Sequence, residues 1–189
     1  MNRVLRKTSF WLCGLALMAA LPLFLSAQQE MPGRPPELGL RDSGGQQHSL
    51  ADYHEKIVIL NFWATWCIPC KNEMPVFSEV QRRYGPEGVQ VLAASLDDSS
   101  TKQYIPRFAH SYKMDFPILL DATADHMQKL GLGEVAPSTA FLDRDGHIVF
   151  RILGQASRSD VESRVQWLLG NRQGTAPEAL LDHSGKKKR

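Results

Sequence analysis

Cysteine is scarce in this chain, with three residues among 189. Cys13 lies in an apolar N-terminal stretch, where we interpret it as an ordinary apolar residue. Beyond that stretch only Cys67 and Cys70 remain, so the chain is not a small domain that depends on several disulfides for its stability. The one intrachain bridge open to it there joins these two cysteines, which are three positions apart.

The chain also lacks a strong excess of positive charge, because its net charge is only +2 at pH 7. Basic residues gather at the two ends, in 1–27 and 171–189, and acidic residues outnumber basic ones between them. An acidic domain gives no reason to expect nucleic-acid binding. There are no internal repeats, and no motif indicates a nucleotide or an organic cofactor, so we predict no cofactor.

Acidic residues are missing from the start of the chain, where none precedes Glu30. No charged residue of either sign lies between Lys7 and Glu30. A basic start, an apolar centre and small residues at the end are typical of a secretory signal peptide. Export makes disulfide chemistry available, because cytosolic thiols are kept reduced.

Two alternatives stay open for residues 1–27. Cleavage after Ala27 would make them a signal peptide, although Leu25 is unfavourable three positions before that bond. The uncharged span also matches the roughly 20 residues that cross a bilayer, so the segment can instead be an anchor that contacts the membrane through residues 8–27. In both cases we expect the rest of the chain in the periplasm or another extracytoplasmic compartment.

The remainder divides into three parts. Residues 28–37 are rich in proline, glutamine and glycine and are predicted to form a linker. Residues 38–170 are long enough for one domain with its own core. Residues 171–189 end in three lysines and an arginine and are predicted to form a disordered basic tail. A contact of this tail with anionic lipid or an acidic partner is the alternative.

Apolar runs alternate with segments of helical pattern through the domain. This order predicts an α/β fold, with a central mixed β-sheet flanked by helices and an N-terminal β-hairpin over 38–50. The expected strands lie at 57–63, 89–96, 117–120, 138–142 and 147–153, and the expected helices at 68–84, 101–112, 122–130 and 157–169. The run Asp97–Ser100 is expected to cap the helix at 101–112.

The two cysteines follow directly on the first central strand. The apolar run 57–63 leads into Trp66-Cys67-Ile68-Pro69-Cys70, at the start of an expected helix. A buried strand that delivers Cys-x-x-Cys to a helix N-terminus is typical of a thiol–disulfide redox site. Free N–H groups and partial positive charge at that terminus stabilise a thiolate. We therefore expect Cys67 to be the nucleophile and Cys70, one turn further in, to be the more buried resolving cysteine.

The sequence around the cysteines resembles a known family. Residues 61–75 resemble the active-site segment of the thioredoxin fold, and specifically that of exported TlpA/ResA-like thiol–disulfide oxidoreductases. Residues 135–143 resemble the second signature of the family. The resemblance covers about 36–170 and implies a thioredoxin-like fold with a central insert between about Asp97 and Leu120.

The resemblance also implies a proton-transfer residue. Ordinary thioredoxins carry a buried aspartate in the strand before the site, and the matching residue here is Asn61. The TlpA/ResA-like branch uses a glutamate in the active-site helix, which matches Glu73. Glu73 is three residues after Cys70, on the same helical face. A desolvated carboxyl there has a raised pKa and can exchange a proton with Cys70. The alternative is an exposed carboxylate that only complements the helix dipole.

Three further residues are expected to bind the substrate. The resemblance alone implies that Pro137 follows a cis peptide beside the cysteines, where the backbone of Ala136 can pair with an extended substrate segment. An ordinary proline at the start of a strand is the alternative. Trp66 precedes the nucleophile and is expected on an exposed apolar surface, whereas Trp63 is expected in the core.

These residues predict an exported thiol–disulfide oxidoreductase that exchanges disulfides with the thiols and disulfides of exported proteins. The resemblance implies the reductive direction, as in cytochrome c maturation, with electrons supplied by a membrane thiol carrier. The first alternative is a Cu(I)-binding, metallochaperone-like protein that uses the same cysteines. The second is an inert structural disulfide in a binding domain. The six histidines are scattered outside any Cys/His motif, so we assign no metal ligand.

Overall fold

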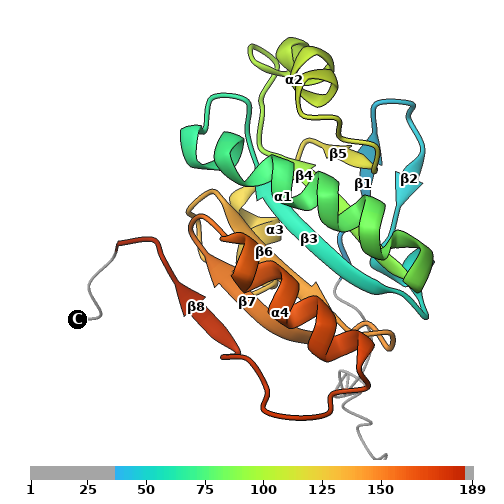
Figure 1. Ribbon diagram of the computed structural model, residues 1–189. Helices are drawn as coiled ribbons and strands as arrows, with labels where there is room; N and C mark the ends of the chain where they lie inside the picture. The colour runs from blue at the N-terminus through green and yellow to red at the C-terminus, as the bar shows by residue number, and fades with distance from the viewer. Residues whose placement is uncertain (1–36, 186–189) are drawn as a thin grey trace, which may run out of the picture. The chain divides into compact units, whose positions relative to one another are not determined.

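An eight-stranded mixed β-sheet forms the centre of the structure, with strand order β2-β1-β5-β4-β3-β6-β7-β8 (Figure 1). The computed structural model describes residues 37–185. The prediction of a signal peptide or anchor at 1–27 lies outside these residues, as does that of a linker at 28–37 except for its last residue, and the last four residues of the chain also lie outside.

From β1 to α4, the strands and α-helices follow one another in the order that the sequence predicts. The strands are β1 (Leu40–Asp42), β2 (Gln47–His48), β3 (Ile57–Trp63), β4 (Val89–Ser95), β5 (Ile118–Leu120), β6 (Ser138–Leu142), β7 (Ile148–Leu153) and β8 (Leu180–Asp182). The α-helices are α1 (Ile68–Tyr84), α2 (Ile105–Ser111), α3 (Ala124–Lys129) and α4 (Arg158–Leu169), and the 3-10 turns are η1 (Leu50–Tyr53), η2 (Gly85–Glu87) and η3 (Lys102–Tyr104).

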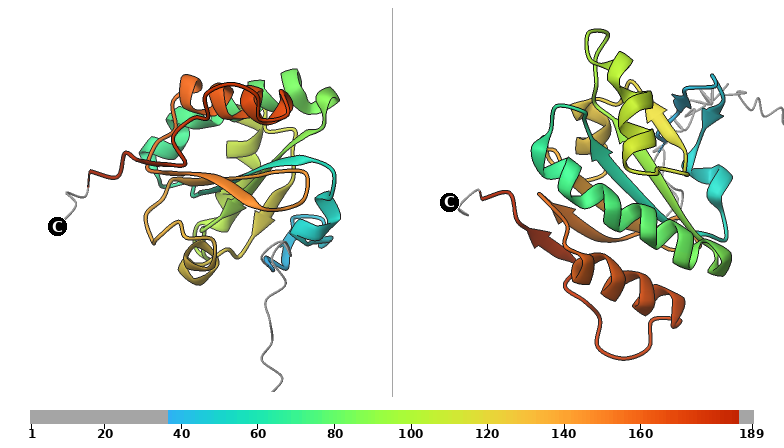
Figure 2. Two further views of the ribbon diagram at one scale, coloured as in Figure 1. Left: turned by 90° about the horizontal axis from the view of Figure 1, so that it is seen from below. Right: turned by 45° about the horizontal axis from the view of Figure 1, so that its top comes forward.

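β3 is the central strand, and all seven of its residues are buried. It pairs in parallel with β4 and antiparallel with β6, so Asn61 lies opposite Ala93 on one side and Thr139 on the other. Alternate side chains enter two separate cores. α1 and α4 cover one face of the sheet and α3 covers the other (Figure 2). β3 is apolar on both faces because both faces are covered.

The expected thioredoxin-like α/β fold is therefore confirmed, including the hairpin in which β1 pairs with β2. The helix expected at 101–112 is instead two pieces, η3 and α2. Pro106 explains the break, because it has no N–H to donate to the carbonyl of Lys102. That carbonyl accepts the N–H of Ile105. None of the helices in the part of the chain that the structure describes is long and apolar enough to span a membrane.

The prediction of a disordered tail from residue 171 is wrong for β8. This strand pairs in parallel with β7 (Figure 1), and the pairing is extended by hydrogen bonds from Arg151 N to Ala179 O (2.8 Å) and from His183 N to Leu153 O (2.7 Å). Without β8, β7 would leave a row of N–H and C=O groups unpaired at the sheet edge. The domain therefore continues beyond residue 170, and the basic residues that suggested disorder lie after it.

Gly154 lies close to the C-terminal segment, so a substitution at this position can test the contact between them. Its φ is +88°, and an added Cβ would lie 2.7 to 2.9 Å from backbone atoms of His183 and Ser184. Gly88 has a similar φ of +92° with open space around it. We expect Gly88→Ala to cost about 1 kcal/mol for the left-handed backbone, and Gly154→Ala to cost more because the C-terminal segment must move.

Chemical denaturation of the two variants measures this difference. Truncation after residue 174 removes the close contact and should make the two substitutions equally costly. Equal costs in the full-length chain would contradict the contact between Gly154 and the C-terminal segment.

Candidate active site

Cys67 and Cys70 form a disulfide at the start of α1, with an S–S distance of 2.04 Å. Cys67 is the N-cap of the helix, and its sulfur accepts a hydrogen bond from the backbone N–H of Cys70 at 3.3 Å. Cys67 is 5% exposed and Cys70 is fully buried, as predicted. Reduction would leave the Cys67 sulfur facing the free N–H groups of the helix start, which stabilise a thiolate.

A buried carboxylate holds the loop before the cysteines. Thr65 donates from its backbone N–H to Asp97 Oδ2 at 2.9 Å and from its hydroxyl to Asp97 Oδ1. The hydroxyl of Ser95 donates to Asp97 Oδ2 at 2.8 Å. Within the run that was expected to cap the next helix, Asp97 thus ties the end of β4 to the loop that carries Trp66, and Asp98 makes the capping contacts to Ser100. The position of Asp97, two residues after the end of the central strand β4, was the signal for its contact with the active-site loop.

Glu73 is buried beneath the active-site loop, with 1% of its surface exposed. Its Oε1 accepts a hydrogen bond from Asn61 Nδ2 at 2.7 Å, and its Oε2 accepts one from the backbone N–H of Ala156 at 2.8 Å. Burial raises the pKa of Glu73 to about 8, against the lowering effect of these two hydrogen bonds. The expected desolvated carboxyl is confirmed, and the exposed carboxylate is excluded.

Asn61 links this carboxyl to a third element. Its Nδ2 also donates to the hydroxyl oxygen of Thr139 on β6, at 3.1 Å. The side chains of β3, α1 and β6 therefore meet at one buried polar point, next to the helix turn that carries the cysteines. Thr139 was missed by sequence reasoning, because only the register of β3 on β6 places it opposite Asn61.

The second predicted segment also reaches the site. The peptide bond between Ala136 and Pro137 is cis, as the resemblance implied. Ala136 is partly buried and packs against the apolar cluster that contains Cys67 and Cys70. The carbonyl of Pro137 accepts the N–H of Gly154 at 2.8 Å, which ties the segment to the end of β7.

The surface around the disulfide is apolar and open. Trp66 is 58% exposed and Ile68 is 70% exposed, whereas Trp63 is fully buried, as expected for both tryptophans. A Cys-x-x-Cys pair beside an exposed apolar surface, with a buried carboxyl of raised pKa on the same helix, can form a mixed disulfide with a partner and move a proton as that disulfide resolves.

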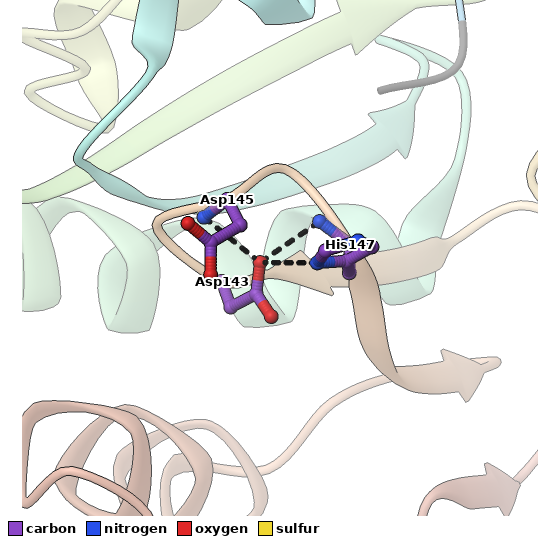
Figure 3. A group of neighbouring side chains, drawn as sticks. All are labelled: Asp143, Asp145 and His147. Carbon is purple, nitrogen blue, oxygen red and sulfur yellow. Dashed lines mark hydrogen bonds and ion pairs between the residues drawn. The ribbon is translucent and has the colours of Figure 1, made fainter. Parts of the chain in front are cut away.

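The cysteines do not belong to a metal-binding cluster among residues 37–185. The one group there with three potential ligands is Asp143, Asp145 and His147 (Figure 3). Asp143 Oδ1 accepts the backbone N–H groups of Asp145 at 3.0 Å and His147 at 2.8 Å, and Oδ2 pairs with Arg172. These bonds are those of a tight hairpin.

This hairpin lies at the opposite end of the sheet from the disulfide. Leu142, just before Asp143, pairs with Val58 near the start of β3, whereas the cysteines follow the end of β3. The group in Figure 3 therefore supplies no third ligand to the cysteines, and the Cu(I) alternative gains no support from it.

Glu73 predicts a pH dependence of stability. Its pKa of about 8 in the folded protein lies above its ordinary value of 4.5. Between these values the folded state holds a proton that the unfolded chain has released, so the free energy of unfolding falls as the pH rises from about 5 to about 8. The expected fall is a few kcal/mol, at about 1.4 kcal/mol per pKa unit.

Denaturation of the oxidised protein at several pH values measures this slope. Glu73→Gln does not titrate and should show a flatter dependence over the same range. The same slope in both proteins would contradict a buried carboxyl with a raised pKa.

Comparisons with known proteins agree with this geometry. Residues 33–151 match the model of the AhpC/TSA family. The thiol–disulfide oxidoreductase ResA of Geobacillus thermodenitrificans is 34% identical over 131 residues, which cover 69% of this chain and 74% of that protein. The thioredoxin-like protein YneN of Bacillus subtilis is 31% identical over 130 residues, which cover 69% and 75%.

Solved structures show the same fold. StoA from Bacillus subtilis superposes with a TM-score of 0.56 at 25% identity, over 69% of this chain and 97% of that one. A thiol:disulfide interchange protein of the thioredoxin family from Chlorobium tepidum TLS gives a TM-score of 0.63 at 23% identity, over 74% and 97%. Together with the Cys67–Cys70 disulfide, these matches identify the chain as a member of the AhpC/TSA family and, within it, a thiol–disulfide oxidoreductase of the ResA type.

Proposed function

We propose that this oxidoreductase is exported and reduces disulfides of other exported proteins. The observation that carries the proposal is the buried carboxyl of Glu73, with a pKa of about 8, three residues after Cys70. A group that titrates near neutral pH is matched to proton transfer under physiological conditions.

The proposed reaction has two steps. In the first, the Cys67 thiolate attacks one sulfur of the partner's disulfide, so a Cys67–partner bond forms and the other partner sulfur leaves as a thiolate. In the second, Glu73 takes the proton of the Cys70 thiol, and the Cys70 thiolate attacks the Cys67 sulfur. The Cys67–Cys70 disulfide forms again and the second partner thiolate leaves. Two electrons have then passed from the cysteine pair to the partner.

We propose that the hydrogen bonds to Glu73 adjust its pKa for the proton transfer of this second step. The bonds from Asn61 and the Ala156 N–H favour the carboxylate, and burial favours the protonated acid. The two effects oppose each other, but burial is the larger one, so the protonated acid is the major form at neutral pH and the carboxylate is a minor form that remains accessible. Such a balance lets Glu73 accept the proton in one direction of the reaction and return it in the other.

Trp66, Ala136 and Pro137 are proposed to bind the partner. Trp66 offers an exposed aromatic surface beside Cys67, and burial of such a surface contributes strongly to binding. Ala136, which precedes Pro137, packs against the cluster that contains both cysteines. An extended partner segment that pairs with the backbone of Ala136 would be held over the disulfide.

The direction and the compartment complete the proposal. Residues 1–27 have the pattern of a signal peptide or anchor, and residues 28–37 that of a linker. An oxidising compartment keeps the cysteine pair oxidised unless a donor reduces it, so the proposal includes a membrane thiol carrier as electron donor. Cytochrome c maturation, in which cysteines must be reduced before they react, is the pathway that we propose for the protein.

The two cysteines should behave differently when they are replaced. Cys70→Ser removes the resolving thiol, so it should accumulate mixed disulfides with partner proteins, whereas Cys67→Ser removes the nucleophile and should form none. Non-reducing gels of the two variants, probed for adducts that disappear on reduction, measure this. Equal adduct formation by both variants would contradict the assignment of Cys67 as nucleophile.

Glu73 should act on resolution rather than on attack. In Glu73→Gln we expect the resolution of the mixed disulfide to slow by about 100-fold and to lose its dependence on a group with a pKa near neutrality. Rapid-mixing kinetics of single turnover with a disulfide peptide separate the two steps. Glu73→Asp, which keeps a carboxyl, should retain a titrating step. A wild-type rate of resolution in Glu73→Gln across the pH range would rule out the proton transfer.

A further inference from the structure

A groove lies beside the nucleophile, and apart from Trp66 none of its residues has a part in the reaction described above. It has a volume of about 480 Å³ and lies between the active-site loop and the insert that carries η3 and α2. Trp66 lines one side and Tyr104, Arg107 and Tyr112 line the other. Because Trp66 directly precedes Cys67, any chain that reaches Cys67 from this side must cross the groove.

The far wall of the groove is fixed to the core. Phe108 of α2 packs on Trp63 at the end of β3, with ring centroids 4.6 Å apart. The hydroxyl of Ser78 on α1 donates to the carbonyl of Tyr112, just after α2, at 2.9 Å. The groove is therefore a built part of the fold whose two walls keep their spacing.

Large apolar side chains are exposed on both walls. Trp66 is 58% exposed and Tyr104 is 55% exposed, and they are among the few large apolar residues of the described chain that remain so open. Exposed aromatic residues that face each other across a groove are typical of a binding surface. An aromatic or large aliphatic side chain would fill the space between them.

The charges on the groove have one sign. Lys71 of α1 and Arg107 of α2 line it, no carboxylate does, and neither cation has an ion pair within residues 37–185. Glu73, the acid nearest to Lys71 in sequence, is buried and bonded to Asn61. The two acids that precede the insert are bonded to other residues, Asp97 to Thr65 and Asp98 to Ser100. The groove is thus cationic in a region where acidic residues outnumber basic ones.

We propose that this groove binds the segment of the partner protein that flanks its reactive cysteine, and that it selects an apolar side chain next to a carboxylate. Trp66 and Tyr104 contact the apolar side chain, and Lys71 and Arg107 pair with the carboxylate. This inference rests on the proposed function, because it describes the partner of the same cysteine. It gives the enzyme a preference among disulfides that the cysteines alone cannot provide.

Peptide disulfides test the proposal with the Cys70→Ser protein, in which adducts accumulate. Short peptides carry a central cysteine as a mixed disulfide with 2-mercaptoethanol, flanked by phenylalanine with glutamate, by phenylalanine with lysine, or by alanine with glutamate. The Cys67 thiolate attacks the peptide sulfur, the protein–peptide disulfide forms and 2-mercaptoethanol leaves as its thiolate. Mass spectrometry follows the rate of that adduct.

We expect the phenylalanine–glutamate peptide to react about fivefold faster than the phenylalanine–lysine peptide, because each exposed ion pair contributes a fraction of a kcal/mol. Arg107→Glu should remove or reverse this preference. Arg82→Glu makes the same charge change on the exposed part of α1 outside the groove, and it should keep the preference. Tyr104→Ala should make the phenylalanine and alanine peptides react alike.

The remaining outcomes each decide against the proposal. Equal rates for the peptides, or the same preference in Arg107→Glu and Arg82→Glu, would overturn it. Self-association in sedimentation experiments that Tyr104→Ala abolishes would assign the groove to a second copy of the chain and overturn it as well.

The small neutral disulfide bis(2-hydroxyethyl) disulfide distinguishes a failure of the groove proposal from a failure of the proposed function. While it reacts at Cys67 it does not extend into the groove, so it should react at the same rate with every variant. If it reacts normally while the peptides show no preference, the groove proposal fails and the proposed function stands. If Cys67 does not react with it at all, the proposed function fails, and the groove proposal fails with it.

Discussion

The hydrogen bond from Asn61 Nδ2 to Glu73 Oε1 joins the middle of the central strand to the helix that carries the cysteines. Asn61 is a polar residue in a strand whose seven side chains are all buried, so its amide must find partners inside the core. Its Nδ2 finds them in Glu73 and in Thr139 of the neighbouring strand, whereas its Oδ1 accepts no hydrogen bond from the residues that the structure describes. Without this contact and the Ala156 N–H, a carboxyl as deeply buried as Glu73 would lack compensation for its lost hydration. The core that holds the sheet together thus also sets the acid–base behaviour of the site.

Most strands of the sheet could be predicted because each has a recognisable hydrophobic pattern within its own segment of the sequence. The run 57–63 is apolar at every position except Asn61, which is expected only where both faces of a strand are covered, and β3 has that environment. β8 was missed because its own segment carries no such pattern. Leu180 and Leu181 are a short apolar pair in a polar tail, and only the open edge of β7 makes a strand of them. The run Asp97–Ser100 was predicted to cap the next helix, and its local pattern does not show that Asp97 bonds to Thr65 while Asp98 makes the capping contacts.

The functional site also contains residues that local sequence predicts and contacts that it does not. The cysteines and Glu73 could be predicted from their spacing and from the family resemblance, since they lie within two turns of one helix. The partners of Glu73 come from β3 and from the loop before α4, 12 and 83 residues away, and no local pattern indicates them. The groove beside Trp66 was equally hidden, because the packing of Phe108 on Trp63 decides where the insert lies. A single sequence gives little information about contacts between distant segments.

The equilibrium reduction potential of the Cys67–Cys70 pair tests the central claim, that this enzyme reduces its partners. Trp66 lies next to Cys67 and is exposed, so tryptophan fluorescence in dithiol redox buffers can follow the transition. The account predicts a value near that of thioredoxin, about −270 mV, which favours electron transfer to partner disulfides. A value near about −120 mV would make the protein a donor of disulfides and would contradict the proposed direction.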